Sequence, residues 1–567
     1  MVKRAWPIIR EGMMRLFNAA LEHGHFPRRW KRGELVIIKK AGNRDFSDPG
    51  SYRPICLQPV FGKVLETLVI TRVMIRLRTQ GRMSGDQYGF TEGRSVTDAI
   101  NRAMEVTEMA NEKYVLGIFL DIQGAFDNVW WPYVMHRLKE MDCLRNLYRI
   151  ILDYFRDREV TLRANYYTQR KFAEKGCPQG SVMGQHLWNI VLDEVLKRNE
   201  NVEKIAFADD CLLIVKDGSR LSLERKAQQA IDEITDWCAR AKFKLSAPKT
   251  EMMFFKGKMD AERPPRIKIN GTRIALKEKV RYLGVVLEGN RLKVNFNPHC
   301  QSAAVTAIRN YGRLRQLMGT GQSGYHQRAM LTLYKGAIVP ILTYACSAWG
   351  DRITYIDKRA LIRAQRNALR GITRMYSTTP TNSITVLTGL LPVDLLALQQ
   401  QLRGMIRRGL TVKIGETVWT ERGVRNDPDG VEKDLENWIV GQWQERWNTS
   451  ATGLWTKEFF PVVNNKIRWK IIKDNDLCQM ITGHGDFHAY LHRFGFRDNP
   501  ACVCGEPETP KHMIDECPRY KLARFCLQQE IEATTGVTRW PVDRQILVNE
   551  CLEHFQRFIH KIRKIRK

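Results

Sequence analysis

Residues 204–216 read Lys-Ile-Ala-Phe-Ala-Asp-Asp-Cys-Leu-Leu-Ile-Val-Lys. Two apolar runs rich in strand-forming residues flank the adjacent carboxylates Asp209 and Asp210, and this pattern predicts a short hairpin with both acids at its turn. Adjacent anions repel each other, so a fold that holds them together normally supplies a cation. Magnesium, which takes hard oxygen ligands and leaves room for phosphate, suits that need. A solvated Asp-Asp turn is the alternative, and this stretch alone does not decide between the two.

A third carboxylate stands in a matching context 88 positions earlier. Residues 115–127 read Val-Leu-Gly-Ile-Phe-Leu-Asp-Ile-Gln-Gly-Ala-Phe-Asp, an apolar strand that ends in Asp121. A tight turn at Gly124 and Ala125 and the aromatic Phe126 follow before an expected helix. A strand-terminal aspartate beside a hairpin-tip pair could hold two metal ions, which activate a 3′-hydroxyl and stabilise a leaving pyrophosphate.

These two boxes resemble those of the reverse transcriptases of non-LTR retrotransposons. Phe-Ala-Asp-Asp at 207–210 corresponds to the catalytic box, and 120–127 corresponds to the box with the first aspartate. The resemblance implies an RNA-directed DNA polymerase that extends a DNA 3′-hydroxyl on an RNA template. It implies two magnesium ions, with manganese as an alternative, on Asp121, Asp209 and Asp210.

The same resemblance implies an α+β fold of the right-hand polymerase type. We expect fingers and a palm with a βαββαβ-type sheet and helices on one face, a helical thumb, and a small C-terminal zinc-binding-type module. The expected domains are a helical extension over 1–24, fingers and palm over 25–290, thumb over 291–413, a connecting region over 414–500, and a Cys/His nucleic-acid-binding region with a basic tail over 501–567.

Nucleotide contacts follow from the family boxes. An aromatic at Phe126 would clash with a ribose 2′-hydroxyl and so select deoxynucleotides, although an ordinary core phenylalanine is the alternative. The next acid, Asp127, is expected at the N-terminus of a helix rather than as a metal ligand. Lysines and arginines could equally be solvated surface charges. The resemblance assigns the nucleotide site to Lys39, Arg53, Phe126, Gln179, Gly180 and Lys249.

Template and primer contacts come from two further boxes. In residues 87–100, Arg94 can reach a template phosphate, and Ser95 or Thr97 can cap a helix through residue 112. Residues 279–287 resemble the strand turn that holds the primer end. The chain departs from the family at Gln185, where proline is usual, and at Ser246, where asparagine is preferred. The template and primer residues implied are Arg94, Tyr282, Leu283 and Gly284.

Composition supports a nucleic-acid partner. Among 567 residues, 91 lysines and arginines face 61 acids, a formal charge of +30, and such an excess favours polyanions through counterion release. The expected partners are RNA template, DNA primer or target, and deoxynucleoside triphosphates, with no membrane, since no apolar run nears roughly 18 residues. Thirteen cysteines and no secretory signal predict an intracellular protein, nuclear where it acts, with a cytoplasmic ribonucleoprotein as an alternative.

Four residues near the C-terminus have the spacing of a metal site. Cys502, Cys504, His512 and Cys517 form C-x-C-x7-H-x4-C, and three sulfurs with one imidazole suit one tetrahedral zinc ion. The family carries a similar zinc-knuckle-like segment, expected to bind RNA or DNA. Residues 561–567 are expected to form a basic tail for phosphates or nuclear import.

The whole pattern looks most like the Pol product of insect elements of the R-one type. Polyproteins of that family also carry an endonuclease, usually upstream, and no such segment is recognised here, so the chain is expected to be N-terminally truncated. No ribonuclease H constellation is recognised either. Two alternatives stay open: a catalytically inactive, nucleic-acid-binding transposon remnant, and a reverse transcriptase of the group II intron maturase or telomerase type.

Overall fold

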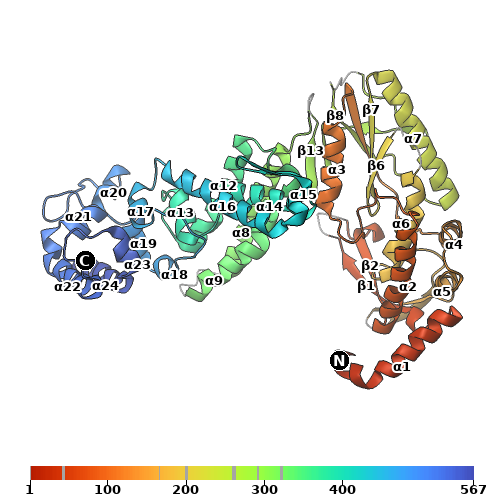
Figure 1. Ribbon diagram of the computed structural model, residues 1–567, viewed down its shortest axis with the longest axis horizontal. Coiled ribbons are helices and arrows are strands. Elements are labelled where there is room, and N and C mark those ends of the chain that lie inside the picture. The colour runs from red at the N-terminus through yellow and green to blue at the C-terminus, as the bar shows by residue number, and fades with distance from the viewer. Residues whose placement is uncertain are drawn as a thin grey trace. The chain divides into compact units, whose positions relative to one another are not determined.

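The computed structural model describes residues 2–40, 45–164, 167–197, 202–257, 263–289, 293–318 and 324–566. Its contacts divide the chain into two compact units, Met1–Asn295 and Phe296–Lys567 (Figure 1). Both units mix helices with strands, as the sequence predicts, although the strands are concentrated in the first unit.

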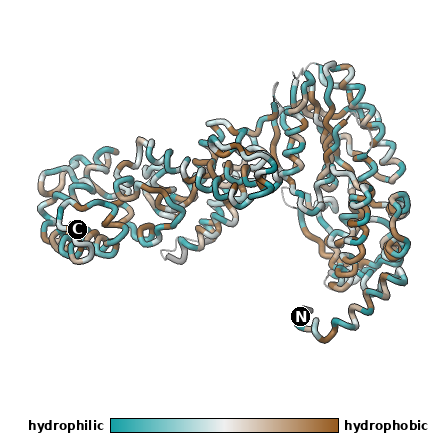
Figure 2. The backbone as a smooth tube through the Cα atoms, viewed as in Figure 1, coloured by the Kyte–Doolittle hydropathy of each residue, from teal (hydrophilic) through white to brown (hydrophobic). Residues whose placement is uncertain are grey.

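The first unit is built on a five-stranded sheet in the order β11-β8-β3-β7-β6. Its central strand β3 is antiparallel to β7 and to β8, and β6 with β7 makes the predicted hairpin. In Figure 2 the hydrophobic positions of this sheet run along its strands. The strands are β3 (Tyr114–Leu120), β6 (Val202–Phe207), β7 (Asp210–Asp217), β8 (Glu251–Lys256) and β11 (Ala275–Leu276).

Helices cover both faces of this sheet, so the prediction of helices on one face is wrong. Alternate β7 residues, Leu213 among them, join a core with α6 (Val182–Lys197) and α7 (Arg220–Ala241). Leu212 is buried on the opposite face, where α3 (Val96–Glu108) packs against β6 and β7 (Figure 1). The reason lies in the strands themselves, which carry apolar residues at nearly every position and therefore need cover on both sides.

Helix α3 begins where the sequence predicts and ends earlier. Ser95 is its N-cap, and Asp98 returns a bond to the Ser95 backbone, which completes a capping box. The helix ends at Glu108, four residues before the expected end. Similarly, Asp127 lies in a turn rather than at a helix N-terminus, because the next helix, α4, begins only at Trp131.

A second, four-stranded sheet has the order β2-β1-β4-β5, with β1 parallel to β4. Its strand β2 contacts the turn before α6 through a main-chain bond from the Cys56 amide to the Gln179 carbonyl (2.8 Å). The elements are β1 (Arg32–Lys39), β2 (Tyr52–Leu57), β4 (Glu159–Ala164), β5 (Tyr167–Phe172), α1 (Val2–His23), α2 (Val60–Thr79), α4 (Trp131–Glu140), α5 (Arg145–Phe155), and the short turns η1 (Arg28–Lys31) and η2 (Pro49–Ser51).

Two small hairpins complete the first unit. One joins β9 (Lys268–Ile269) to β10 (Thr272–Arg273), and the other joins β12 (Lys279–Tyr282) to β13 (Val285–Glu288). Leu283 and Gly284 form the turn of the second hairpin with φ of +47° and +84°, as a two-residue hairpin turn with the twist of its strands requires.

The second unit is mainly helical. Its α8 packs against α12, and α14 packs between α11 and α16. Trp443 and Trp447 of α16 are fully buried, in keeping with tryptophans used for core packing. The elements are α8 (Asn297–Met318), α9 (Gly324–Leu333), η3 (Tyr334–Ile338), α10 (Val339–Leu342), α11 (Cys346–Trp349), α12 (Tyr355–Thr373), α13 (Thr381–Thr388), α14 (Val393–Arg407), β14 (Val412–Ile414), β15 (Thr417–Trp419), α15 (Glu421–Asn426), α16 (Pro428–Asn448), α17 (Leu454–Phe459), α18 (Trp469–Ile472), α19 (Asn475–Thr482), α20 (His488–Arg493), α21 (Pro510–Asp515), η4 (Pro518–Tyr520), α22 (Lys521–Thr535), α23 (Arg544–Asn549) and α24 (Leu552–Arg566).

The basic C-terminal segment is the end of helix α24 rather than an extended tail. Ile562 is fully buried, and Arg563 and Arg566 turn inward to the loop that carries Asp486. One side of the segment therefore packs into this unit, while Lys561, Lys564 and Ile565 are exposed. Lys567 lies outside the described residues.

None of the described helices is by itself long and apolar enough to cross a membrane. Taken together, α13 and α14 meet that test of length and composition as a pair bent by 57°.

Candidate active site and metal centre

The strand register brings the three predicted aspartates together. Leu120 of β3 is paired with Cys211 of β7 in an antiparallel register. Asp121 follows Leu120 and Asp210 precedes Cys211, so continuing this register puts the two aspartates opposite each other. Directly opposed Cα atoms in antiparallel strands lie roughly 4.5–5.5 Å apart. Asp209 occupies the adjoining turn between β6 and β7. Carboxylates separated by 88 positions in the sequence thus meet at one end of the sheet.

Burial and neighbouring negative charge both raise the pKa of two of these aspartates. Burial raises the pKa of Asp209, and the charge of Asp121 raises it further. Burial, then Asp209, then Asp121 raise the pKa of Asp210 to about 6. A cation between the three groups would reverse these shifts, because it favours the charged form. Three hard oxygen donors at one end of the sheet would suit magnesium or manganese.

A loop after α7 supports Asp121 from its backbone. The amide of Asp121 donates to Thr250 Oγ1 (3.2 Å), and its carbonyl accepts from the Ser246 amide (2.9 Å). The same loop carries Lys249, whose Nζ lies 4.0 Å from Asp121 Oδ2. The lysine predicted for the nucleotide site is therefore beside the acids.

The tip of the β6–β7 hairpin is held by side chains from two other elements. Ala208 has φ +59°, a left-handed conformation that a residue with a Cβ adopts rarely. Its amide donates to Gln87 Oε1 (3.0 Å), and its carbonyl accepts from Gln87 Nε2 (3.2 Å) and Trp188 Nε1 (3.0 Å). These three bonds fix the residue immediately before Asp209. Sequence reasoning missed Gln87, whose signal was its place at the head of the 87–100 box.

Gly89 and Phe90, in the same 87–100 box, contact the hairpin tip and Phe126. A Cβ added at Gly89 would overlap the backbone nitrogen of Ala208. The Gly89 carbonyl accepts from the buried Asn189 Nδ2 (2.9 Å). Phe90 then stands edge-to-face against Phe126, with ring centroids 6.0 Å apart. The other neighbour of Phe126 is Trp188, at 5.7 Å, so the predicted steric gate lies between two aromatic rings.

The Pro-Gln-Gly-Ser turn packs behind Phe126. Cys177 donates its amide to the Phe126 carbonyl (2.7 Å). Gly180 has φ +120°, and a Cβ there would come 2.6 Å from the Cys56 carbonyl oxygen, so glycine is required for packing against β2. The buried carboxylate of Glu66 accepts from the Ser181 hydroxyl and the first amides of α6. Sequence reasoning missed Glu66, an acid on the buried stripe of α2.

The predicted cations of the four-stranded sheet are not brought to one face. Arg53 is paired with Ile38, so Lys39 is one register position away and points to the opposite side. Lys39 Nζ lies 4.6 Å from the ring centroid of Phe46. Both side chains are exposed.

The predicted template and primer residues differ in their exposure. Arg94 is exposed, and its guanidinium lies 4.7 Å from the Tyr88 ring centroid and binds the Gly85 carbonyl. The Tyr282 side chain is buried against Phe119 (5.3 Å). The side chain of Tyr282 is thus a core residue, and the Leu283–Gly284 turn is the part of this hairpin that lies nearer solvent.

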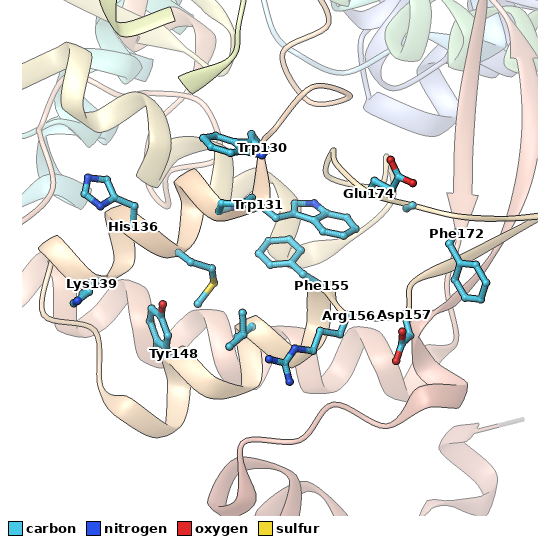
Figure 3. Close-up of a pocket in the computed structure, with 14 residues that line it drawn as sticks. Trp130, Trp131, His136, Lys139, Tyr148, Phe155, Arg156, Asp157, Phe172 and Glu174 are labelled. Atoms are coloured by element: carbon cyan, nitrogen blue, oxygen red, sulfur yellow. The ribbon is translucent and has the colours of Figure 1, made fainter. Parts of the chain in front are cut away.

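An aromatic hollow of about 840 Å³ lies behind the Phe126 loop. Figure 3 shows Trp131 and Phe155 side by side within it; their rings are stacked with centroids 4.9 Å apart. The Trp131 indole donates to the Gly176 carbonyl (2.8 Å), which ties the hollow to the Pro-Gln-Gly-Ser turn. Its other labelled residues are Trp130, His136, Lys139, Tyr148, Arg156, Asp157, Phe172 and Glu174.

In the second unit the four predicted zinc ligands converge. Ligand atoms from all four lie within 4.8 Å of one another. Cys517 Sγ is 3.7 Å from Cys502 Sγ and 3.9 Å from Cys504 Sγ, and thiolates about 2.3 Å from a tetrahedral zinc stand about 3.8 Å apart. His512 Nε2 is 3.1 Å from Cys504 Sγ. The donor set and its spacing fit tetrahedral zinc.

Neighbouring residues orient this cluster. His512 Nδ1 lies 3.9 Å from Glu516 Oε2, an ion-pair distance rather than a hydrogen bond. Arg524 is buried and donates to the carbonyls of Ile514 and Cys517, both at 2.8 Å. The backbone of Cys517, which lies between α21 and η4, is therefore held in place by Arg524.

Comparison with known proteins shows which sequences this chain is similar to. Residues 38–287 match the family described as reverse transcriptase (RNA-dependent DNA polymerase), and this region is a reverse transcriptase domain. The chain is 34% identical over 535 residues to the Pol polyprotein of the type-1 retrotransposable element R1 of Bradysia coprophila, covering 92% of this chain and 52% of that protein.

Two further relatives are also proteins of mobile elements. A 115 kDa protein of the R1DM element of Drosophila melanogaster is 33% identical, covering 91% of this chain and 50% of that protein. The RNA-directed DNA polymerase of the Drosophila melanogaster mobile element jockey is 26% identical, covering 62% and 38%. The chain is thus a relative of the Pol proteins of R1-type non-LTR retrotransposons, and it spans about half the length of the R1 proteins of Bradysia coprophila and Drosophila melanogaster.

Among solved structures, apo telomerase from Candida tropicalis superposes with a TM-score of 0.35 at 13% identity, covering 66% of this chain and 67% of that one. This likeness is too low to bear on fold or function.

Proposed function

We propose that the chain is an RNA-directed DNA polymerase that extends a DNA 3′-hydroxyl on an RNA template, with Asp121, Asp209 and Asp210 as its metal ligands. The observation that carries the proposal is the β3–β7 register, which opposes Asp121 to Asp210 beside the hairpin turn. Two magnesium ions bound there would lower the pKa of the attacking hydroxyl and stabilise the leaving pyrophosphate.

The protein's own groups supply position and charge. Gln87 and Trp188 fix the backbone before Asp209, so the acids are arranged before substrate binds. In this proposal Lys249, 4.0 Å from Asp121, neutralises or protonates the leaving pyrophosphate. The Phe126 ring would exclude a ribose 2′-hydroxyl. The Gly180 backbone and Gln179 would lie along the base pair.

The finer architecture belongs to this proposal. The four-stranded sheet would act as fingers, the five-stranded sheet as palm, and helices α8 and α12 as the thumb. Arg363, Arg366 and Arg370 line a groove with α8 residues, which suits contact with duplex phosphates. Arg366 also holds the carbonyls of Ser377 and Thr379, so its role is partly structural.

We further propose one zinc ion on Cys502, Cys504, His512 and Cys517, in a module that binds the RNA or the DNA. The sulfur spacing near 3.8 Å supports it. By analogy with the Pol proteins it resembles, the chain would act at nicked chromosomal DNA in the nucleus, where the nicked strand serves as primer.

The test is primer extension with a homopolymer RNA template, a DNA primer and deoxynucleotides, with and without magnesium. Asp210→Asn should lower extension by roughly 10³-fold or more, while RNA binding stays within about twofold. Asp127→Asn is the matched control, because Asp127 is an exposed acid in the same box, and it should extend normally. Undiminished synthesis by Asp210→Asn would refute the metal assignment. A wild-type chain that binds RNA without extending primer would favour an inactive remnant.

A further inference from the structure

Phe90 has two features that ordinary packing does not require. Its backbone has φ +55°, a region that bulky side chains rarely adopt. Its ring is nevertheless 41% exposed, so the strain is not offset by burial of a large apolar surface. Strained residues persist where the surrounding structure over-determines them, and they cluster at functional sites.

The strained backbone is held in place by buried groups. The Gly89 amide donates to Gln87 Oε1 (2.8 Å), and the Gly89 carbonyl accepts from Asn189 (2.9 Å). Gly89 also lies against the Ala208 backbone without room for a Cβ. The segment that carries Phe90 is therefore fixed to the same hairpin tip that carries Asp209.

The Phe90 ring packs against a second aromatic ring. It meets Phe126 edge-to-face at 6.0 Å with an interplanar angle of 87°, a favoured geometry for aromatic pairs. Trp188 supports Phe126 from another side at 5.7 Å. Trp188 is fully buried, so Phe90 is the partner of Phe126 that stands nearer solvent.

We propose that Phe90 is a positioning residue for sugar discrimination, which holds the ring of Phe126 against the sugar of the incoming nucleotide. The inference rests on the proposed polymerase function and on the gate role of Phe126. Without the Phe90 ring, Phe126 has room to rotate away, and the space for a 2′-hydroxyl opens. The metal cluster is unaffected, because the Gln87 and Trp188 bonds to Ala208 do not involve the Phe90 side chain.

The experiment measures single-nucleotide incorporation of a deoxynucleotide and of the matching ribonucleotide by the full chain on an RNA template. The discrimination ratio is kcat/KM for the deoxynucleotide divided by kcat/KM for the ribonucleotide. Phe90→Ala should lower this ratio at least tenfold, because the KM for the ribonucleotide falls, and the magnesium half-saturation should stay unchanged. Phe90→Tyr keeps the ring and should keep the ratio. Phe525→Ala, at an exposed aromatic of the second unit, is the matched control.

Phe90→Gly separates this role from a structural one. Glycine adopts φ +55° without strain, so this variant should melt no lower than Phe90→Ala and still lose discrimination. Phe90→Ala combined with Phe126→Ala should be no less selective than Phe126→Ala alone, because Phe90 acts through Phe126.

Three results would overturn the inference. If the discrimination ratio is unchanged in Phe90→Ala but lowered in Phe126→Ala, the proposed polymerase function stands and Phe90 has no role in sugar discrimination. Equal losses for both nucleotides would make Phe90 a structural residue. A wild-type chain that extends no primer would remove the proposed function and this inference together.

Discussion

Nζ of Lys249 lies 4.0 Å from Oδ2 of Asp121, in a loop that bonds the Asp121 backbone on both sides. The lysine side chain is 73% exposed, so the pair contributes little to folding, in the range of roughly 0–1 kcal/mol. In the proposed function this lysine is a proton donor beside the acids.

Lys249→Ala should therefore lower kcat by roughly 10²-fold, the usual size of a general-acid contribution. Lys249→Arg should not restore the rate, because a guanidinium stays protonated. Lys244→Ala, an exposed lysine nearby in sequence, is the control. Single-turnover rates across pH provide the measurement, and full rescue by arginine would show that charge alone is needed.

Gly89→Ala should disturb the hairpin tip. The new Cβ overlaps the Ala208 backbone nitrogen, and overpacking of this kind costs about 1–3 kcal/mol. We expect at least a tenfold loss of extension and a higher magnesium half-saturation, because Asp209 follows Ala208 directly. Gly218→Ala meets open space and should behave as wild type. Normal magnesium dependence in Gly89→Ala would show that the tip tolerates displacement.

Zinc analysis by atomic absorption should find one ion per chain, and Cys517→Ser should reduce it well below one. The same variant should lower the melting temperature of the protein, because structural zinc contributes folding energy directly. Cys526→Ser is the control, since Cys526 is an exposed free thiol. Equal zinc content in Cys517→Ser and wild type would contradict the ligand set.

Asp486 should make the second unit sensitive to acid. Burial pushes its pKa up, but the hydrogen bond and charge of Arg566, with the charges of Arg563 and Arg497, outweigh this and hold the pKa below its usual value. A depressed folded pKa gives stability that is present above the unfolded value of about 3.9 and is lost as pH falls through the folded one.

Asp486→Asn should therefore destabilise the protein by about 1 kcal/mol at pH 7, a small value because the side chain is half exposed. The difference in melting temperature from wild type should shrink as pH falls from 5 towards 3. Asp498→Asn, at an exposed position, is the control. A difference that stays constant with pH would show that the Arg566 pair does not stabilise the fold.

The sequence by itself determined the local elements and the chemistry of the site. The apolar run before Asp121, the Phe-Ala-Asp-Asp hairpin and the spacing of Cys502 to Cys517 each depend on neighbours within a few residues. Such patterns are set by side-chain periodicity, turn residues and ligand type. They predict the strands of these two boxes, the acids at their ends and a Cys/His metal site without reference to long-range contacts.

Tertiary structure alone decided which distant residues support the site. Gln87 is marked only by its place at the head of the 87–100 box, and nothing local marks Glu66 or Asn189, because the partners of all three are 100 or more positions away. The strand register separated Lys39 from Arg53, and packing buried Ile562 and Arg563 on one side of the basic C-terminal helix. Sheet register and burial depend on contacts between segments far apart in the chain, and one sequence does not display these.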